Sequence, residues 1–389
     1  MKKVLFLIAL CLCSCASSAK KEVEVQWKCK KINSETLTNI SALSECYGYI
    51  RFFYPNPNLK NVNWTKFLMY SVDKIWNVKN DNELKHILLE LFEPLCPQIT
   101  FSTDKVISNT ILQPPFYAIE HKAIGTMAEM FFGKSYSPIV QITKQNIDYN
   151  DVYCYKLKDN LYVNFPVAVK NLPIKTDKLK KLEKKLKKIN EGKVGVLSAL
   201  FNQKNVYKGN IIYKRLSYRI ADIIIRKNYI QHFYPYFAED NLTESWDNEF
   251  SKTIENIVLT DNMYNYFMEI KKLLANINDS HINIWNTFLI GTTGAYLQYF
   301  YPNITYSFAN GTCYIAGIGQ EYENDLKRGD IIKSVNNTSI ETLIEQKLQE
   351  ISFSTRANGL YRMSNLFQSQ KRDSVITIAV ETADKTEKL

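Results

Sequence analysis

The sequence contains little glycine, proline and histidine, and its cysteines are not closely paired. Glycine (13) and proline (11) are too scarce among 389 residues for a collagen-like or low-complexity chain. The four histidines form no H-x-x-x-H or H-E-x-x-H pattern, and no C-x-x-C pair occurs. Metal sites commonly use these spacings, so we expect no metal ion and no cofactor.

The positive charge is concentrated in one segment. The formal net charge is +10, and the stretch from Lys175 to Lys193 contributes +6 of it, with nine lysines against three acidic residues. Lys2 and Lys3 add two charges, so the rest of the chain carries only +2. Proteins that bind nucleic acid spread basic residues over a binding face, so we expect no nucleic-acid partner.

The N-terminus has the layout of an export signal. Two lysines precede the apolar run Val4–Leu12, which is too short to span a bilayer. The segment Leu12-Cys13-Ser14-Cys15 resembles the bacterial lipobox, in which the last cysteine is lipidated. We expect a signal peptide over residues 1–14, a lipid anchor at Cys15, a tether over residues 15–40, and a place in the cell envelope, in the outer membrane. Secretion without lipid and a retained anchor are the alternatives.

The remaining cysteines are widely spaced and odd in number, so they predict neither a disulfide scaffold nor a zinc site. A single disulfide between Cys46 and Cys96 fits an oxidising compartment, but small buried thiols are the favoured interpretation. The five positions are Cys29, Cys46, Cys96, Cys154 and Cys313.

Two segments, residues 41–97 and 211–285, share a spacing pattern. In each, an apolar helix runs into a Tyr-Pro pair, at 54–55 and at 234–235, where proline ends the helix. Two further helices follow, and their apolar residues recur at helical intervals. The pattern predicts duplicated units of three helices that pack on one another. The matching stripes are Trp64, Leu68, Val72, Ile75, Leu88, Leu91, Phe92 and Leu95 in the first unit, and Trp246, Phe250, Ile254, Ile257, Ile270, Leu273, Leu274 and Ile277 in the second.

The sequence between the two units changes character twice. Residues 98–175 contain alternating runs of Val, Ile and Tyr, which predict a β-rich segment. Residues 176–192 predict a basic helix with Thr176 as N-cap and Gly192 after its end. Its leucines form one stripe, which indicates that one face of the helix packs on the core. The lysines on the other faces then either contact solvent or face a membrane.

The C-terminal segment, residues 291–385, predicts short strands with one or two helices. Together with the helical units, it makes the fold class α+β and multidomain. The run from Leu326 to Asn336, L-K-R-G-D-I-I-K-S-V-N, resembles the PDZ domains of bacterial envelope proteases. Such domains bind an extended chain terminus as an added strand. The resemblance assigns the carboxylate-binding loop to Gly294, Ala295, Tyr296 and Leu297, although this loop also fits a simple connection between strands.

The order of these features resembles the tail-specific, or C-terminal processing, serine peptidase family over residues 41–385. The turn Asp279-Ser280-His281 contributes to the likeness, and the closest members are lipid-anchored proteins of Bacteroidetes-type bacteria. The resemblance implies polypeptide C-termini or unfolded segments as partners. Asp279 and His281 are also candidates for an acid–base pair or metal ligands, but we favour a turn with His281 at the start of a strand.

The family cleaves peptides with a serine activated by a lysine, and these residues follow the PDZ domain. This sequence ends at Leu389, and no Ser/Ala-rich turn of that kind occurs before it. Ser71 and Lys74 form an S-x-x-K pattern within a predicted amphipathic helix, where we expect them at the surface. We therefore assign no catalytic residue and expect either a peptidase part without its hydrolase domain or a non-catalytic peptide-binding adaptor.

Overall fold

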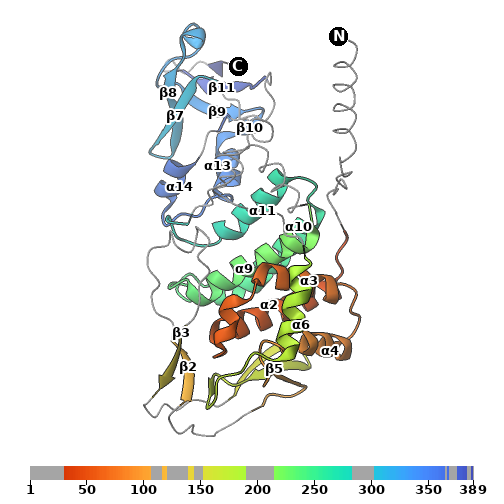
Figure 1. The fold of residues 1–389 in the computed structure, drawn as a ribbon. Helices are drawn as coiled ribbons and strands as arrows, with labels where there is room; N and C mark the ends of the chain where they lie inside the picture. The colour runs from red at the N-terminus through yellow and green to blue at the C-terminus, as the bar shows by residue number, and fades with distance from the viewer. Residues whose placement is uncertain are drawn as a thin grey trace, which may run out of the picture.

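The computed structural model describes residues 30–106, 116–120, 139–143, 152–189, 214–282, 302–363, 366–367, 375–382 and 387–388. These residues form a mixed α+β fold with a helical part in the middle, small sheets at one end and the C-terminal sheet at the other (Figure 1). Cys15, Gly192 and the loop from Gly294 to Leu297 lie outside the described residues.

Two sets of three α-helices make up most of the helical part. In each set the last helix is N-capped by an asparagine: Asn80 accepts from Glu83 N at 2.9 Å, and Asn262 accepts from Asn265 N at 2.8 Å. The first set begins earlier than the predicted boundary at residue 41, because Asn33 already caps its first helix. The sets are α2 (Ser34–Phe53), α3 (Trp64–Ile75) and α4 (Asp81–Phe92), and α9 (Leu216–Phe233), α10 (Leu242–Leu259) and α11 (Met263–Ala275).

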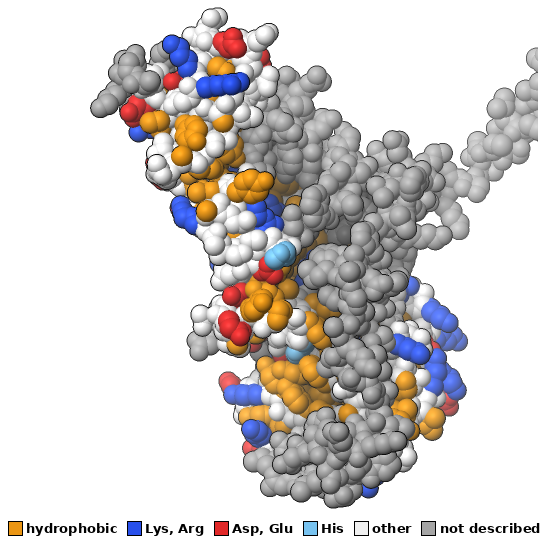
Figure 2. All heavy atoms as spheres, turned by 90° about the vertical axis from the view of Figure 1, so that its left-hand side faces the viewer, with side chains coloured by type: hydrophobic (Ala, Val, Ile, Leu, Met, Phe, Trp, Pro, Cys, Tyr) orange, Lys and Arg blue, Asp and Glu red, His pale blue; other side chains and the backbone are white. Residues whose placement is uncertain are grey.

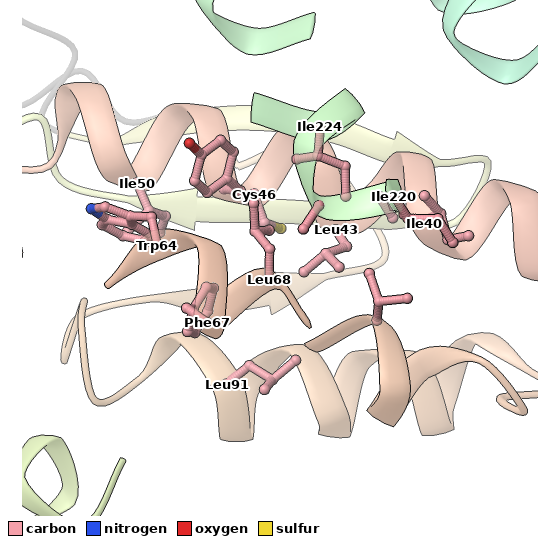
Figure 3. Close-up of a cluster of buried hydrophobic side chains, with 14 of the residues drawn as sticks. Ile40, Leu43, Cys46, Ile50, Trp64, Phe67, Leu68, Leu91, Ile220 and Ile224 are labelled. Atoms are coloured by element: carbon pink, nitrogen blue, oxygen red, sulfur yellow. The ribbon is translucent and has the colours of Figure 1, made fainter. Parts of the chain in front are cut away.

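Both sets share one hydrophobic core, whereas we expected each unit to pack on itself. Helix α3 lies against α9, and α10 lies against α2. Helix α2 carries buried side chains around most of its circumference, so two partner helices from its own set cannot cover it. Figure 3 shows side chains from four helices converging: Ile40, Leu43, Cys46 and Ile50 of α2, Trp64, Phe67 and Leu68 of α3, Leu91 of α4, and Ile220 and Ile224 of α9.

The segment between the sets forms two antiparallel three-stranded sheets, with strand orders β1-β5-β4 and β3-β2-β6. Leu161, Val163 and Phe165 of β5 are buried in the same core as the helices. The alternation of apolar residues along β5 therefore points one face at the helices. The strands are β1 (Thr100–Ser102), β2 (Phe116–Glu120), β3 (Ile139–Thr143), β4 (Tyr153–Lys158), β5 (Leu161–Phe165) and β6 (Ala168–Val169).

The basic helix α6 (Asp177–Lys187) begins at the predicted cap, since Thr176 Oγ1 accepts a hydrogen bond from Leu179 N at 3.2 Å. Leu179, Leu182 and Leu186 are buried against the helical core. The leucine stripe thus faces inward, and the lysines occupy the outer faces. No helix in the described ranges combines the length and the low polarity needed to cross a membrane.

Cys46 and Cys96 are free thiols, both fully buried, so the possible disulfide between them is not formed. Burial raises the pKa of both thiols above the usual value for cysteine. They act as small hydrophobic side chains of the core, which was the favoured interpretation of the sequence.

The C-terminal part has a hydrophobic core of its own. Its sheet is antiparallel with the strand order β12-β11-β9-β8-β7, and β10 pairs with β9. The elements are β7 (Ile304–Ala309), β8 (Thr312–Ile318), η2 (Gln320–Tyr322), β9 (Ile331–Val335), β10 (Thr338–Ser339), α13 (Ile340–Leu348), α14 (Arg356–Arg362), β11 (Ile378–Glu381) and β12 (Glu387–Lys388).

Helices α2 and α9 approach most closely at Gly48. A Cβ atom at this position would lie 1.8 Å from Asn228 Oδ1 and 2.7 Å from His232 Nε2. Asn228 is fully buried, and its amide nitrogen lies 2.9 Å from both Ser44 Oγ and Ile224 O. The asparagine therefore has little freedom to move aside, and only glycine fits opposite it.

A buried ion pair joins the same two helices. Lys227 Nζ is hydrogen-bonded to Glu45 Oε1 and lies 2.8 Å from Asp247 Oδ1, and the lysine side chain is only 1% exposed. Burial disfavours the charged form of Lys227, but the two carboxylates outweigh this, and the pKa of Lys227 is raised. The pair therefore links α2 to the second helix set by a charge interaction that excludes water.

We expect Gly48→Ala to lower the free energy of unfolding by up to about 2 kcal/mol. Crowding against Asn228 costs about 1–3 kcal/mol, which exceeds the roughly 1 kcal/mol that alanine gains in a helix. Urea unfolding of the single variants and of Gly48→Ala with Asn228→Ala forms a double-mutant cycle. Additive effects, or a stabilising Gly48→Ala, would contradict the close crossing.

We expect Lys227→Met to cost about 3–5 kcal/mol of stability, because it leaves the Glu45 carboxylate buried without its partner. Adding Glu45→Gln removes that charge and should recover part of the loss, whereas Lys252→Met, at an exposed position, should change stability by less than about 0.5 kcal/mol.

The stabilisation by Lys227 should also depend on pH. Since the pKa of Lys227 is raised in the folded protein, its contribution to stability is complete below about pH 10.4 and disappears as the pH rises through its folded pKa. Denaturant unfolding at several pH values measures all three effects.

Candidate functional site

The strands of the C-terminal unit are joined by tight turns whose residues have positive φ. Asn310 (φ 49°) and Gly311 (φ 77°) connect β7 to β8, and Asn336 (φ 48°) and Asn337 (φ 62°) connect β9 to β10. Two consecutive residues with positive φ are typical of the hairpin turns whose twist matches that of the strands. These turns fix the register of both hairpins and thereby the shape of the sheet.

The Leu326–Asn336 run leads into the centre of this sheet. Gly329 adopts φ 93°, and its N–H donates to the carbonyl of Ile315 on β8 at 2.9 Å. Asp330 is only 3% exposed, and its Oδ2 accepts a hydrogen bond from Lys327 N at 2.8 Å. Glycine and aspartate thus close the turn that carries Ile332 of β9 into the core.

One edge of the sheet is a candidate surface for an added strand. Among the described residues, β7 is the terminal strand and pairs only with β8. Tyr306 and Phe308 of β7 are half-buried, and Tyr361 of α14 is 89% exposed. Figure 2 looks onto this side of the molecule and shows hydrophobic side chains exposed over the C-terminal part. Tyr306 and Phe308 pack against the core of the unit, so it is the backbone of this terminal strand that is suited to pairing with an extended peptide.

The predicted carboxylate-binding loop, Gly294, Ala295, Tyr296 and Leu297, lies outside the described residues. The part of the unit that is described provides the frame for it: β7 begins at Ile304, and α13 packs on β9 and β10. Ile340, Ile344 and Leu348 of α13 face the core of the unit. The helix is thus held rigidly beside the sheet.

Asp279 and His281 form a local turn. Asp279 Oδ1 accepts a hydrogen bond from His281 N at 2.8 Å and lies 2.8 Å from His281 Nδ1. The His281 side chain is 88% exposed. The aspartate therefore shapes the turn, as favoured from the sequence. His281, expected at the start of a strand, lies in the turn, Ile282 belongs to no strand, and the rest of the predicted strand lies outside the described residues.

A polar seam connects the end of the helical part to the loop between α13 and α14. Ser280 Oγ is hydrogen-bonded to Ser354 Oγ and donates to Asn358 Oδ1 at 2.8 Å. Ser352 Oγ lies 2.6 Å from the carbonyl oxygen of Asp279. Arg362 donates to the carbonyl oxygens of Ser352 at 2.6 Å and of Ile282 at 3.2 Å.

This seam was not identified from the sequence, because isolated serines carry no spacing pattern. Its contacts are hydroxyl and carbonyl groups, with one guanidinium, and they bring together residues more than 70 positions apart. Within the described ranges, it joins the C-terminal unit to the helices by hydrogen bonds, and the two parts have separate hydrophobic cores.

The S-x-x-K pattern differs from our expectation in one respect. Ser71 is fully buried rather than at the surface, and its hydroxyl donates to the carbonyl oxygen of Phe67 at 2.8 Å. Lys74 is partly exposed and lies 3.6 Å from Glu90. The serine points into the core because it occupies the same face of α3 as Phe67 and Ile75. A hydroxyl in this position is not accessible to a substrate.

No group of three or more metal-ligating side chains occurs in the part of the chain that the structure describes. No known protein family matches the chain, and a search of the curated proteins finds no match either. The assignment of a function therefore depends on the residues and their geometry.

Lys271 of α11 is a lysine with a lowered pKa at the boundary between the two parts of the molecule. Burial lowers its pKa, the carboxylate of Glu350 raises it, and the ammonium group of Lys347 lowers it further. Glu350 follows α13 and forms its ion pair with Lys347, at 3.6 Å. Lys271 thus bears its charge in a half-buried position and forms no ion pair with any residue that the structure describes.

We expect Lys271→Met to raise the free energy of unfolding at pH 7 by about 0.5–1 kcal/mol, since it removes a poorly solvated charge. Because the folded pKa is lowered, the penalty is present below that pKa and vanishes above about pH 10.4, where the unfolded lysine is also neutral. Thermal unfolding of Lys271→Met and of the matched variant Lys272→Met, at pH 7 and near pH 10.5, measures this. A gain for Lys272→Met, or a gain independent of pH, would contradict this interpretation.

Proposed function

We propose that this protein is a lipid-anchored protein of the bacterial cell envelope that captures extended polypeptide C-termini through a PDZ-like unit. The observation that carries the proposal is the antiparallel sheet with β7 at its edge, built around the Leu326–Asn336 turn with Gly329 at positive φ and Asp330 buried. A peptide that adds to such an edge as a further strand forms backbone hydrogen bonds with it, and the apolar side chains beside it supply specificity. Gly294 to Leu297 would receive the terminal carboxylate.

In this proposal the helical part consists of two copies of a three-helix unit, and an approximate two-fold axis relates the two copies. Three observations support it. Gly48 and Asn228, which hold equivalent positions before the two Tyr-Pro pairs, touch at the crossing of α2 and α9. The second helix of each set packs against the first helix of the other set. Asn80 and Asn262 also cap equivalent helices. A two-fold axis brings equivalent residues into contact where it passes through an interface.

The chain has the lineage of a tail-specific serine peptidase in this proposal, and the residues assigned here bind rather than cleave. Ser71, the serine of the S-x-x-K pattern, is buried and committed to a backbone carbonyl. The alternative within the same proposal is a peptide-binding adaptor that acts without any hydrolase domain. Incubation of the purified chain with casein does not distinguish these two alternatives, because both expect no cleavage. Cleavage of casein by the chain alone would contradict both.

The proposal is tested by titrating the chain with fluorescent peptides that end in apolar residues and a free carboxylate. We expect binding that is lost or weakened at least about tenfold when the same peptide ends in a carboxamide, because a charge-assisted hydrogen bond to the terminus disappears. Leu297→Asp should lower the affinity by a similar factor, while Lys252→Gln, at an exposed position on α10, should not. Equal affinity for the acid and the amide, or no binding of either, would refute the proposal.

A further inference from the structure

Helix α6 divides its charged side chains into two groups. Four of the lysines in and beside it form ion pairs: Lys175 with Glu183, Lys178 with Glu93, Lys180 with Asp177 and Lys185 with Glu90. Four others form neither an ion pair nor a hydrogen bond within the described part of the chain, and all are exposed: Lys181, Lys184, Lys187 and Lys188.

The second group lies directly opposite the buried leucines. At 100° per residue, Lys181, Lys184, Lys187 and Lys188 cluster on the side of the helix facing away from Leu179, Leu182 and Leu186. Since the leucines are packed in the core, these four ammonium groups point outward. We call them the lysine face of α6.

The acidic side chains around α6 are already used by the first group. Asp177, Glu183, Glu90 and Glu93 each contact a lysine other than those of the lysine face. Asp177 also attracts Lys181, but without forming an ion pair with it. The lysine face therefore retains a concentrated positive charge that the acidic side chains in the described part of the chain do not neutralise.

We propose that the lysine face of α6 is a docking surface for an anionic phospholipid membrane. The argument is charge complementarity: Lys181 and Lys188 lie about 10 Å apart along the helix axis, and a row of this length fits an extended sheet of negative headgroups better than one small anion. The leucines are unavailable for insertion, so the contact is electrostatic and lies at the headgroup surface.

The membrane is within reach of this surface under the proposed function, on whose lipid anchor the inference rests. Lys30 is fixed to the helical part, since its N–H donates to the carbonyl of Val258 at 3.1 Å and its ammonium lies 4.8 Å from the ring of Trp76. The chain from Cys15 to Lys30 spans at most about 50 Å. The anchor keeps the protein near the bilayer, and the lysine face would then determine which side of the protein faces it.

The test uses the mature chain with Cys15→Ser, so that no acyl chain contributes, and sedimentation with lipid vesicles. We expect binding to vesicles of phosphatidylcholine with phosphatidylglycerol, none to phosphatidylcholine alone, and release at high salt. Each surface lysine strengthens partitioning about fivefold, so replacing all four residues of the lysine face by glutamine should weaken it on the order of several hundredfold.

The matched control removes the same charge elsewhere, with Lys252, Lys272, Lys327 and Lys333 replaced by glutamine, and should weaken binding less than about tenfold. The inference is overturned if the two variants lose equal affinity, if the lysine-face variant binds like the unmodified chain, or if duplex DNA binds more tightly than the vesicles at equal phosphate concentration. The assay contains no peptide and the protein carries no acyl chain, so its failure leaves the peptide titration unaffected. Conversely, a lysine-face variant that keeps its peptide affinity separates the two activities.

Discussion

The crossing of α2 and α9 leaves no room for a side chain at Gly48, and the rest of the helical part depends on this contact. A Cβ atom there would collide with Asn228, which is held by hydrogen bonds to Ser44 and Ile224. Beside the crossing, Lys227 and Glu45 are buried as an ion pair. A pair of this kind is weak evidence for net stability, but removing either partner leaves an uncompensated charge in the interior, so the two helices must keep both side chains together.

The close crossing explains why the two helix sets form one core. With α2 and α9 in contact, α3 and α10 each lie in the angle between a helix of their own set and one of the other set. The small sheet β1-β5-β4 covers the remaining apolar surface, with Leu161, Val163 and Phe165 facing the helices. The same arrangement leaves α6 at the surface, where its leucines complete the core and its lysines meet solvent.

The C-terminal unit differs from the helical part in how it is attached. Its core is separate, and its described contacts with the end of α11 and the following turn are made by Ser280, Ser352, Ser354 and Arg362. Polar seams of this type resemble transient interfaces between domains, where relative motion is the default expectation. The C-terminal unit and the helical part can then take up different relative orientations.

The sequence by itself determined the approximate positions of the helices, the N-cap Thr176 and the inward leucine stripe of α6, because periodicity and capping are local properties. Tertiary structure alone decided that Ser71 is buried, that Cys46 and Cys96 stay apart as thiols, and that Lys227 meets Glu45. These outcomes depend on which helix faces meet, and the helices that meet can be far apart in the sequence, as Lys227 and Glu45 are. Spacing along one chain carries no information about such pairings, since the same amphipathic helix can pack against several partners.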